Sequence, residues 1–212
     1  MKRLVAFLLL ACASVAPALA HPHVFVSVSN EVIFTPDGKV GGIRHQWKFD
    51  DMYSAFVTAN LGTDGKDPTP EQMLPIAKTN VESLKEFDFF TFLKMNGKPV
   101  PLKDGADYSM TYDPSDQTVT LYFTLPLEKP APAGKFFVFQ IYDPSYFVAF
   151  EMDRKDPVKL VNSPKGCSLS VNKPGALSAA DQKKLAESAG TNDSPGEDFG
   201  MKLADSIIVA CP

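Results

Sequence analysis

Residues 24–49 alternate apolar and polar side chains on both sides of a turn, and this pattern constrains the fold more than any other stretch. Apolar residues fall mostly on even positions before the turn and on odd positions after it. A period of two is typical of a strand that buries one face. Pro36 and Gly38 between the two halves favour a reversal of the chain. The sequence therefore predicts a β-hairpin whose buried faces carry Val24, Val26, Val28, Val32 and Phe34 on one strand and Ile43, His45, Trp47 and Phe49 on the other.

The position of the turn also predicts the register of this hairpin. A turn centred on residues 37–38 places Val28 opposite Trp47 and Phe25 opposite Asp50. His23 is then a diagonal neighbour of Asp50 on the polar face, at a spacing of roughly 7–8 Å. The adjacent glycines at 41–42 leave an alternative open, because a bulge there would shift the register by one residue.

The remainder of the chain predicts an α+β fold. A short helix is expected to follow Asp50, which would act as its N-cap, and a longer one to run from a capping box at Thr69–Gln72 to about Phe89. Its buried stripe is expected to contain Leu74, Ala77, Val81, Leu84 and Phe87 or Asp88. A third helix is expected at 178–189.

Most of the other segments have strand character. The candidates are Thr91–Met95, Lys98–Leu102, Asp107–Tyr112, Thr118–Thr124, Phe136–Tyr142, Tyr146–Met152, Val158–Asn162 and Ser168–Val171, with a closing helix or strand at Phe199–Val209. The aromatic side chains crowded into this region are expected to pack in the core. The fold class is thus α+β, a mainly antiparallel sheet with two or three segregated helices, although the strand count also permits a sandwich.

The first twenty residues have the parts of a secretory signal peptide. Lys2 and Arg3 precede an apolar run at 4–10, and Ala18–Ala20 forms a small-x-small cleavage site. Cleavage after Ala20 would leave residues 21–212 as a single periplasmic domain. The apolar run is shorter than the roughly 20 residues that span a bilayer. We therefore expect no stable membrane insertion once the signal is removed.

Charge and cysteine content narrow the function further. The chain has a formal net charge of −4, and it contains no basic run, so nucleic-acid binding is not expected. Cys167 and Cys211 remain after export, and two cysteines in an oxidising compartment favour one disulfide. Two buried free thiols are the alternative.

The candidate functional site lies at the mature N-terminus, which would read His21-Pro22-His23. The α-amine and imidazole of His21 can chelate one metal ion together, and His23 adds a second ring. Imidazole and amine ligands suit zinc, copper, nickel and cobalt better than calcium or magnesium. Pro22 has no N–H to deprotonate, so the square-planar amino-terminal copper and nickel motif is blocked.

The predicted site needs a further ligand, and a carboxylate or the amine itself would supply it. Asp50 is the favoured carboxylate because of its place in the hairpin, and Asp51 and Asp143 are weaker candidates. His45 is expected on the core face as a buried histidine hydrogen-bonded to backbone, with metal ligation as the alternative. A tetrahedral set of nitrogen and oxygen ligands favours zinc, with nickel, cobalt or copper next.

At these residues the sequence resembles the bacterial periplasmic proteins of the DUF1007 family, described as the periplasmic component of an uncharacterised transport system. The matching segments are His21–Phe25, Trp47–Ser54 and Tyr142–Phe147, with the late Cys167 and Cys211. Such proteins are linked to inner-membrane permeases of the nickel/cobalt type and some to zinc uptake. The resemblance therefore implies a periplasmic protein that delivers a metal ion to a permease.

Two other functions remain open. One is a copper site like a histidine brace, in a redox enzyme or a chaperone, with His45 as the second histidine. The other is an interaction module without a metal. The sequence contains no GxSxG, P-loop or dinucleotide-binding motif, so we do not expect an enzyme of those classes, and metal delivery without catalysis is the favoured function.

Overall fold

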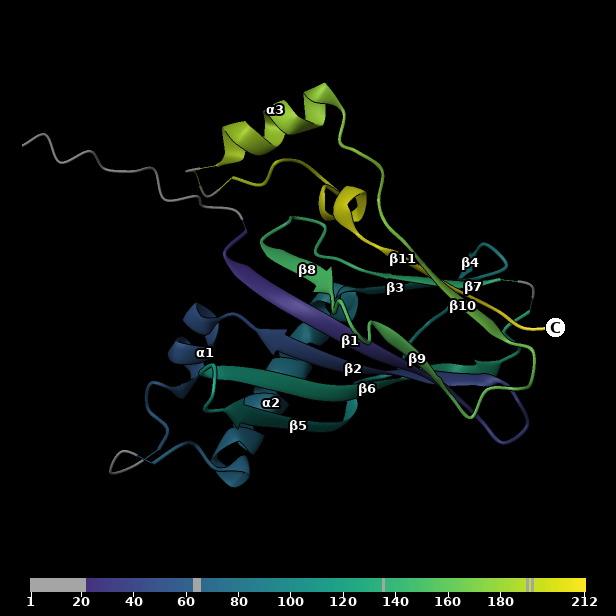
Figure 1. Cartoon of the computed structure of the whole chain (residues 1–212), viewed down its shortest axis with the longest axis horizontal. Coiled ribbons are helices and arrows are strands. Elements are labelled where there is room, and N and C mark those ends of the chain that lie inside the picture. Colours follow the sequence, from purple (N-terminus) through teal and green to yellow (C-terminus); the bar gives the residue numbers. More distant parts are fainter. Residues whose placement is uncertain (1–21, 63–65, 135, 190, 192) are drawn as a thin grey trace, which may run out of the picture.

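The computed structural model describes residues 22–62, 66–134, 136–189, 191 and 193–212 (Figure 1). Within these ranges the chain forms two β-sheets, three α-helices and two short 3-10 helices. The predicted α+β class with mainly antiparallel sheets is confirmed. The predicted signal peptide and His21 lie outside the described residues.

The first sheet is built around the predicted hairpin. Its strand order is β5-β6-β2-β1-β8, and β9 also pairs with β1. The strands are β1 (Val24–Phe34), β2 (Val40–Phe49), β5 (Ala106–Asp113), β6 (Thr118–Ala131), β8 (Val148–Met152) and β9 (Val158–Val161). β8 and β9 pair in parallel with successive parts of β1, so β1 is bonded along both edges and lies inside the sheet.

The register of the hairpin is the predicted one. Val28 pairs with Trp47 and Val32 pairs with Ile43. The irregularity falls at the turn end, between Ile33 and Phe34, where β2 carries one extra residue. Because the bulge lies next to the turn, it leaves the pairing from Ile33 back to Val26 unchanged.

The second sheet has the order β10-β11-β7-β3-β4. Its strands are β3 (Thr91–Met95), β4 (Lys98–Pro99), β7 (Phe137–Ile141), β10 (Ser168–Asn172) and β11 (Ser206–Ala210). The predicted disulfide is confirmed: Cys167 and Cys211 are bonded at the ends of the neighbouring strands β10 and β11. It closes a segment with a sequence separation of 44 residues, which stabilises the fold by roughly 3–4 kcal/mol.

The helices are α1 (Asp51–Thr58), α2 (Pro70–Leu84) and α3 (Ala179–Ser188), and 3-10 helices span Lys85–Phe90 and Gly200–Leu203. The capping box of α2 is confirmed, since the Thr69 hydroxyl accepts from the Gln72 N–H and the Gln72 side chain accepts from the Thr69 N–H. The helix ends at Leu84, before the predicted Phe89. The chain turns there through Asp88, Phe89 and Phe90, all with positive φ, and enters β3.

One cluster of buried apolar side chains joins both sheets and α2. In Figure 1, α2 lies across one face of the first sheet, where it contacts β5 and β6. Met73, Ala77 and Val81 form the buried face of the helix. The predicted stripe was wrong at Leu74, which is 48% exposed, because Met73 instead begins the i, i+4, i+8 row that faces the sheet. It was also wrong at Phe87 and Asp88, which are exposed and follow the end of the helix. No helix in the described ranges is both long enough and apolar enough to cross a membrane.

Candidate functional site

His23 lies immediately before β1 and is anchored to the loop that precedes β8. Its backbone N–H donates to the carbonyl oxygen of Phe147 at 2.8 Å. Its imidazole packs on the Phe147 ring, with the ring centroids 4.4 Å apart. The side chain is half-buried. Backbone and ring contacts to the same residue therefore hold this histidine at the start of β1, at one end of the sheet.

Asp50 lies opposite Phe25, as the register predicted. The Asp50 N–H donates to the Phe25 carbonyl at 3.0 Å, and the Phe25 N–H donates to Asp50 Oδ2 at 2.6 Å. Asp50 Oδ1 accepts from the Tyr53 N–H at 2.7 Å and caps α1. Each carboxylate oxygen thus accepts one backbone hydrogen bond, and each retains a further lone pair. The residue joins the start of β1 to the start of α1.

The other two candidate carboxylates serve local turns. Asp51 is exposed in the first turn of α1, and its Oδ1 accepts from the Met52 N–H at 2.9 Å. Asp143 is only 5% exposed. Its Oδ1 accepts from the N–H and the hydroxyl of Ser145, and its Oδ2 accepts from the Val148 N–H. Asp143 therefore fixes the loop that leads into β8 and carries Phe147.

His45 lies in the core, in the middle of β2. It is 0% exposed, and its ring stacks on Phe123 with centroids 4.8 Å apart. Burial lowers its pKa from 6.5 to about 3, so the ring is neutral at ordinary pH. The expected hydrogen bond to backbone is absent: among the residues that the structure describes, neither ring nitrogen has a partner.

The two described histidines lie far apart along the sheet. His45 pairs with Asn30 of β1, which is seven positions beyond His23 in the chain. At roughly 3.3 Å per residue, these positions are about 20 Å apart along the strand. One metal ion cannot contact both side chains in this fold.

The described residues contain only part of the predicted ligand set, since His21 lies outside them. Among them, no group of three or more His, Cys, Asp or Glu side chains is arranged to hold a metal ion. His23 and Asp50 lie at the same end of the hairpin. A complete site of the predicted kind therefore depends on His21 and its α-amine.

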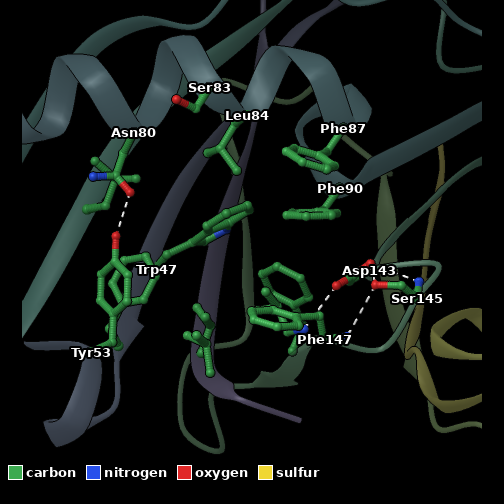
Figure 2. Close-up of a pocket in the computed structure, with 16 residues that line it drawn as sticks. Trp47, Tyr53, Asn80, Ser83, Leu84, Phe87, Phe90, Asp143, Ser145 and Phe147 are labelled. Atoms are coloured by element: carbon green, nitrogen blue, oxygen red, sulfur yellow. Dashed lines mark hydrogen bonds between the residues drawn. The ribbon is translucent and has the colours of Figure 1, made fainter. Parts of the chain in front are cut away.

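The structure contains an apolar pocket that the sequence did not predict. It has a volume of about 430 Å³ and lies between the C-terminal part of α2 and the first sheet. Figure 2 shows Asn80, Ser83 and Leu84 of α2 above it, with Trp47 and Tyr53 on one side and Asp143, Ser145 and Phe147 on the other. The remaining lining residues are Val24, Val26, Phe49, Phe87, Phe90, Leu121, Val148 and Phe150.

The pocket and the N-terminal histidine share a wall. Phe147 lines the pocket and also contacts the ring and the N–H of His23. The signal in the sequence was the aromatic crowding at 136–152, which matches the pattern of ordinary core packing. The pocket could not be found from it because its other wall comes from α2 and the turn after it.

Comparison with known proteins identifies relatives over most of the chain. A family model described as "Protein of unknown function (DUF1007)" matches residues 5–211. An uncharacterised protein of Haemophilus influenzae is 24% identical over 206 residues, a match that covers 91% of this chain and 92% of that protein.

Proposed function

We propose that this chain, which belongs to the DUF1007 family of proteins of unknown function, binds a transition-metal ion at its mature N-terminus. Zinc is the favoured ion, with nickel or cobalt next. The chain would act in the periplasm after removal of residues 1–20, and would pass the ion to an inner-membrane permease of the nickel/cobalt type. No catalytic step is part of this proposal.

The observation that carries the proposal is the anchoring of His23. Its backbone and ring are both held by Phe147, so ligation by His23 would cost little additional side-chain entropy. His21 is two residues earlier in the chain, and two residues span at most about 7 Å. The α-amine and ring of His21 therefore stay within reach of a metal ion bound to His23.

The donor set fits the proposed ions. Two imidazoles and a primary amine are ligands that zinc, nickel and cobalt accept. Histidine and an α-amine have reference pKa values near 6.5 and about 7.7–8.0, so donors of these two types bind metal ions at about neutral pH. Asp50 offers the nearest carboxylate in the hairpin, through the lone pairs that its two backbone hydrogen bonds leave free. An open coordination position would permit transfer of the ion to a second protein.

Delivery to a permease is supported by two features. The resemblance of the segments His21–Phe25, Trp47–Ser54 and Tyr142–Phe147 to the family implies a link with metal permeases. The chain also carries an excess of acidic over basic residues, which attracts cations to its surface.

A thermal melt of the processed, metal-free protein tests the proposal. Zinc, nickel, cobalt and copper would each be added, because a ligand at one hundred times its dissociation constant stabilises a protein by about 2.7 kcal/mol. We expect a clear rise in Tm with one of the first three ions. His21→Ala and His23→Ala should each weaken binding by at least about tenfold.

Asp51→Asn is the matched control, because Asp51 is exposed and its Oδ1 accepts a hydrogen bond from the neighbouring Met52 N–H. This variant should retain the metal-induced rise in Tm. Equal shifts in the wild type and in both histidine variants would contradict a site at the N-terminus. A response to copper alone would contradict the choice of zinc, nickel or cobalt for this site.

A further inference from the structure

We propose that the pocket between α2 and the first sheet is a binding site for a small, uncharged, largely apolar organic molecule. This proposal goes beyond the metal site and does not rest on it. The pocket volume of about 430 Å³ lies within the range of about 300–1,000 Å³ that is typical of small-molecule sites. Protein interiors are otherwise close-packed, so an apolar pocket of this size beside the core provides the space for a bound ligand.

The side chains of the pocket define the chemistry of that occupant. Seven of them are aromatic: Trp47, Phe49, Tyr53, Phe87, Phe90, Phe147 and Phe150. Phe87 and Phe147 are 53% and 45% exposed, although large aromatic side chains usually avoid water. A ligand with a ring or hydrocarbon body would cover both of them and bury the apolar wall behind them.

The charges of the pocket exclude an anionic ligand group. Among the described residues, its lining includes no lysine, arginine or histidine, and Asp143 is the one charged side chain. Both oxygens of Asp143 already accept hydrogen bonds from Ser145 and Val148. A carboxylate or sulfonate inside the pocket would therefore be desolvated without a cation to pair with, and close to another negative charge.

One polar group at the far end of the pocket can orient a ligand. The Tyr53 hydroxyl donates to Asn80 Oδ1 at 2.6 Å, and the Asn80 amide donates to the Ile76 carbonyl at 2.9 Å. Burial raises the pKa of Tyr53, so the phenol stays neutral. The Tyr53 oxygen still has lone pairs that can accept a hydrogen bond, and they suit a single N–H or O–H donor on the ligand.

The backbone beside the pocket is strained. Asp88, Phe89 and Phe90 have φ values of 50°, 52° and 48°, in the left-handed region that residues with a Cβ rarely adopt in succession. This turn brings the rings of Phe87 and Phe90 into a stack, 5.3 Å between centroids, on the pocket wall. Strain of this kind concentrates at ligand sites, because the surrounding structure must be built to hold it.

A pair of related dyes tests both the site and its charge preference. N-phenyl-1-naphthylamine is uncharged and has one N–H donor, whereas 8-anilinonaphthalene-1-sulfonate has the same rings and a sulfonate. Trp47 is the one tryptophan of the chain and lines the pocket, so energy transfer from it reports binding there. The titrations would be done on the processed protein in EDTA, which removes any contribution of metal ions.

We expect one molecule of the uncharged dye to bind per chain, and the sulfonate to bind at least about tenfold more weakly, a difference of about 1.4 kcal/mol. Leu84→Phe places a larger side chain in the pocket and should lower the affinity for the uncharged dye by about tenfold or more. Leu74→Phe is the matched control, because it makes the same change on an exposed position of the same helix and should bind as the wild type does.

Ser83→Phe is the second blocking variant, since Ser83 lines the pocket from an exposed helical position where folding tolerates a larger side chain. This variant should also lower the affinity for the uncharged dye. The proposal is overturned if the folded wild type does not bind the uncharged dye, if the sulfonate binds equally well, or if a folded blocking variant binds like Leu74→Phe.

Discussion

The two described histidines, His23 and His45, show how the same side chain takes on different chemistry in two parts of one hairpin. His23 is half-buried at the end of the sheet and packs on Phe147. His45 is enclosed by the core, stacks on Phe123, and has its pKa lowered to about 3 by burial. Position along the hairpin therefore decides which imidazole can contact a metal ion from solution.

The largest expected effect comes from placing a charge at the buried position. His45→Lys should destabilise the fold by about 3–5 kcal/mol or prevent folding, because an unpaired charge would be buried. His45→Phe keeps the ring, and neither imidazole nitrogen has a partner to lose among the described residues. It should therefore retain or increase the free energy of unfolding in urea. A strong loss in His45→Phe would show that the imidazole makes an interaction missing from this account.

The acid dependence of stability should also report the buried state of His45. The pKa of His45 is about 3 in the folded protein, against an ordinary value of 6.5. Between these pH values the unfolded chain therefore binds a proton at His45 that the folded chain does not bind. Stability therefore rises with pH across this window and is lost as pH falls, by up to about 1.4 kcal/mol per pH unit.

Urea unfolding at several pH values between 3 and 7 measures this slope. The plot of stability against pH should be flatter for His45→Phe than for the wild type. The exposed carboxylates with lowered pKa, such as Asp37 and Asp153, also lose their favourable interactions in acid. They are common to both proteins and cancel in the comparison. Parallel curves for the wild type and His45→Phe would contradict a neutral buried His45.

A smaller effect is expected at the two adjacent aspartates near the N-terminal histidine. Asp50→Ala removes acceptors for the Phe25 and Tyr53 N–H groups, and loss of an N-cap costs about 0.5–2 kcal/mol. Asp51→Ala should change the free energy of unfolding by less than about 0.5 kcal/mol, as exposed substitutions usually do. Equal effects in thermal unfolding would argue against the role of Asp50 as the link between β1 and α1.

Among the substitutions that remove a described contact, the smallest change in the metal-free protein is expected at His23. His23→Ala loses the ring contact with Phe147 but keeps the backbone hydrogen bond, and aromatic pairs contribute about 0.5–1.5 kcal/mol. Differential scanning calorimetry in EDTA should show a small drop in Tm. A drop as large as that of His45→Lys would mean that His23 is chiefly structural.

Local features of the fold were predictable because neighbouring residues encode them. The register of Val28 with Trp47 follows from a period of two around a defined turn, and the α2 capping box follows from Thr69 and Gln72. The end of α2 was not predictable, since no glycine marks the left-handed residues Asp88–Phe90. The parallel pairing of β8 and β9 with β1 joins segments more than a hundred residues apart, and no local sequence pattern predicts such a pairing.

The candidate site was predictable in part for the same reason. The pairing of Phe25 with Asp50 came from the hairpin register, but the packing of His23 on Phe147 depends on β8. The partnerless ring nitrogens of His45 also depend on the surrounding core rather than on its position in β2. The apolar pocket depends on three distant segments at once, and its aromatic residues look in sequence like any others in the core.

The central claim is that a free N-terminal His21 and the anchored His23 bind a metal ion together. Isothermal titration of zinc into the processed chain, and into the same chain with one alanine added before His21, tests it most directly. We expect one zinc ion per chain and at least about a tenfold loss of affinity on extension, because a ligand is removed. Equal dissociation constants for the two chains, or no binding to either, would contradict it.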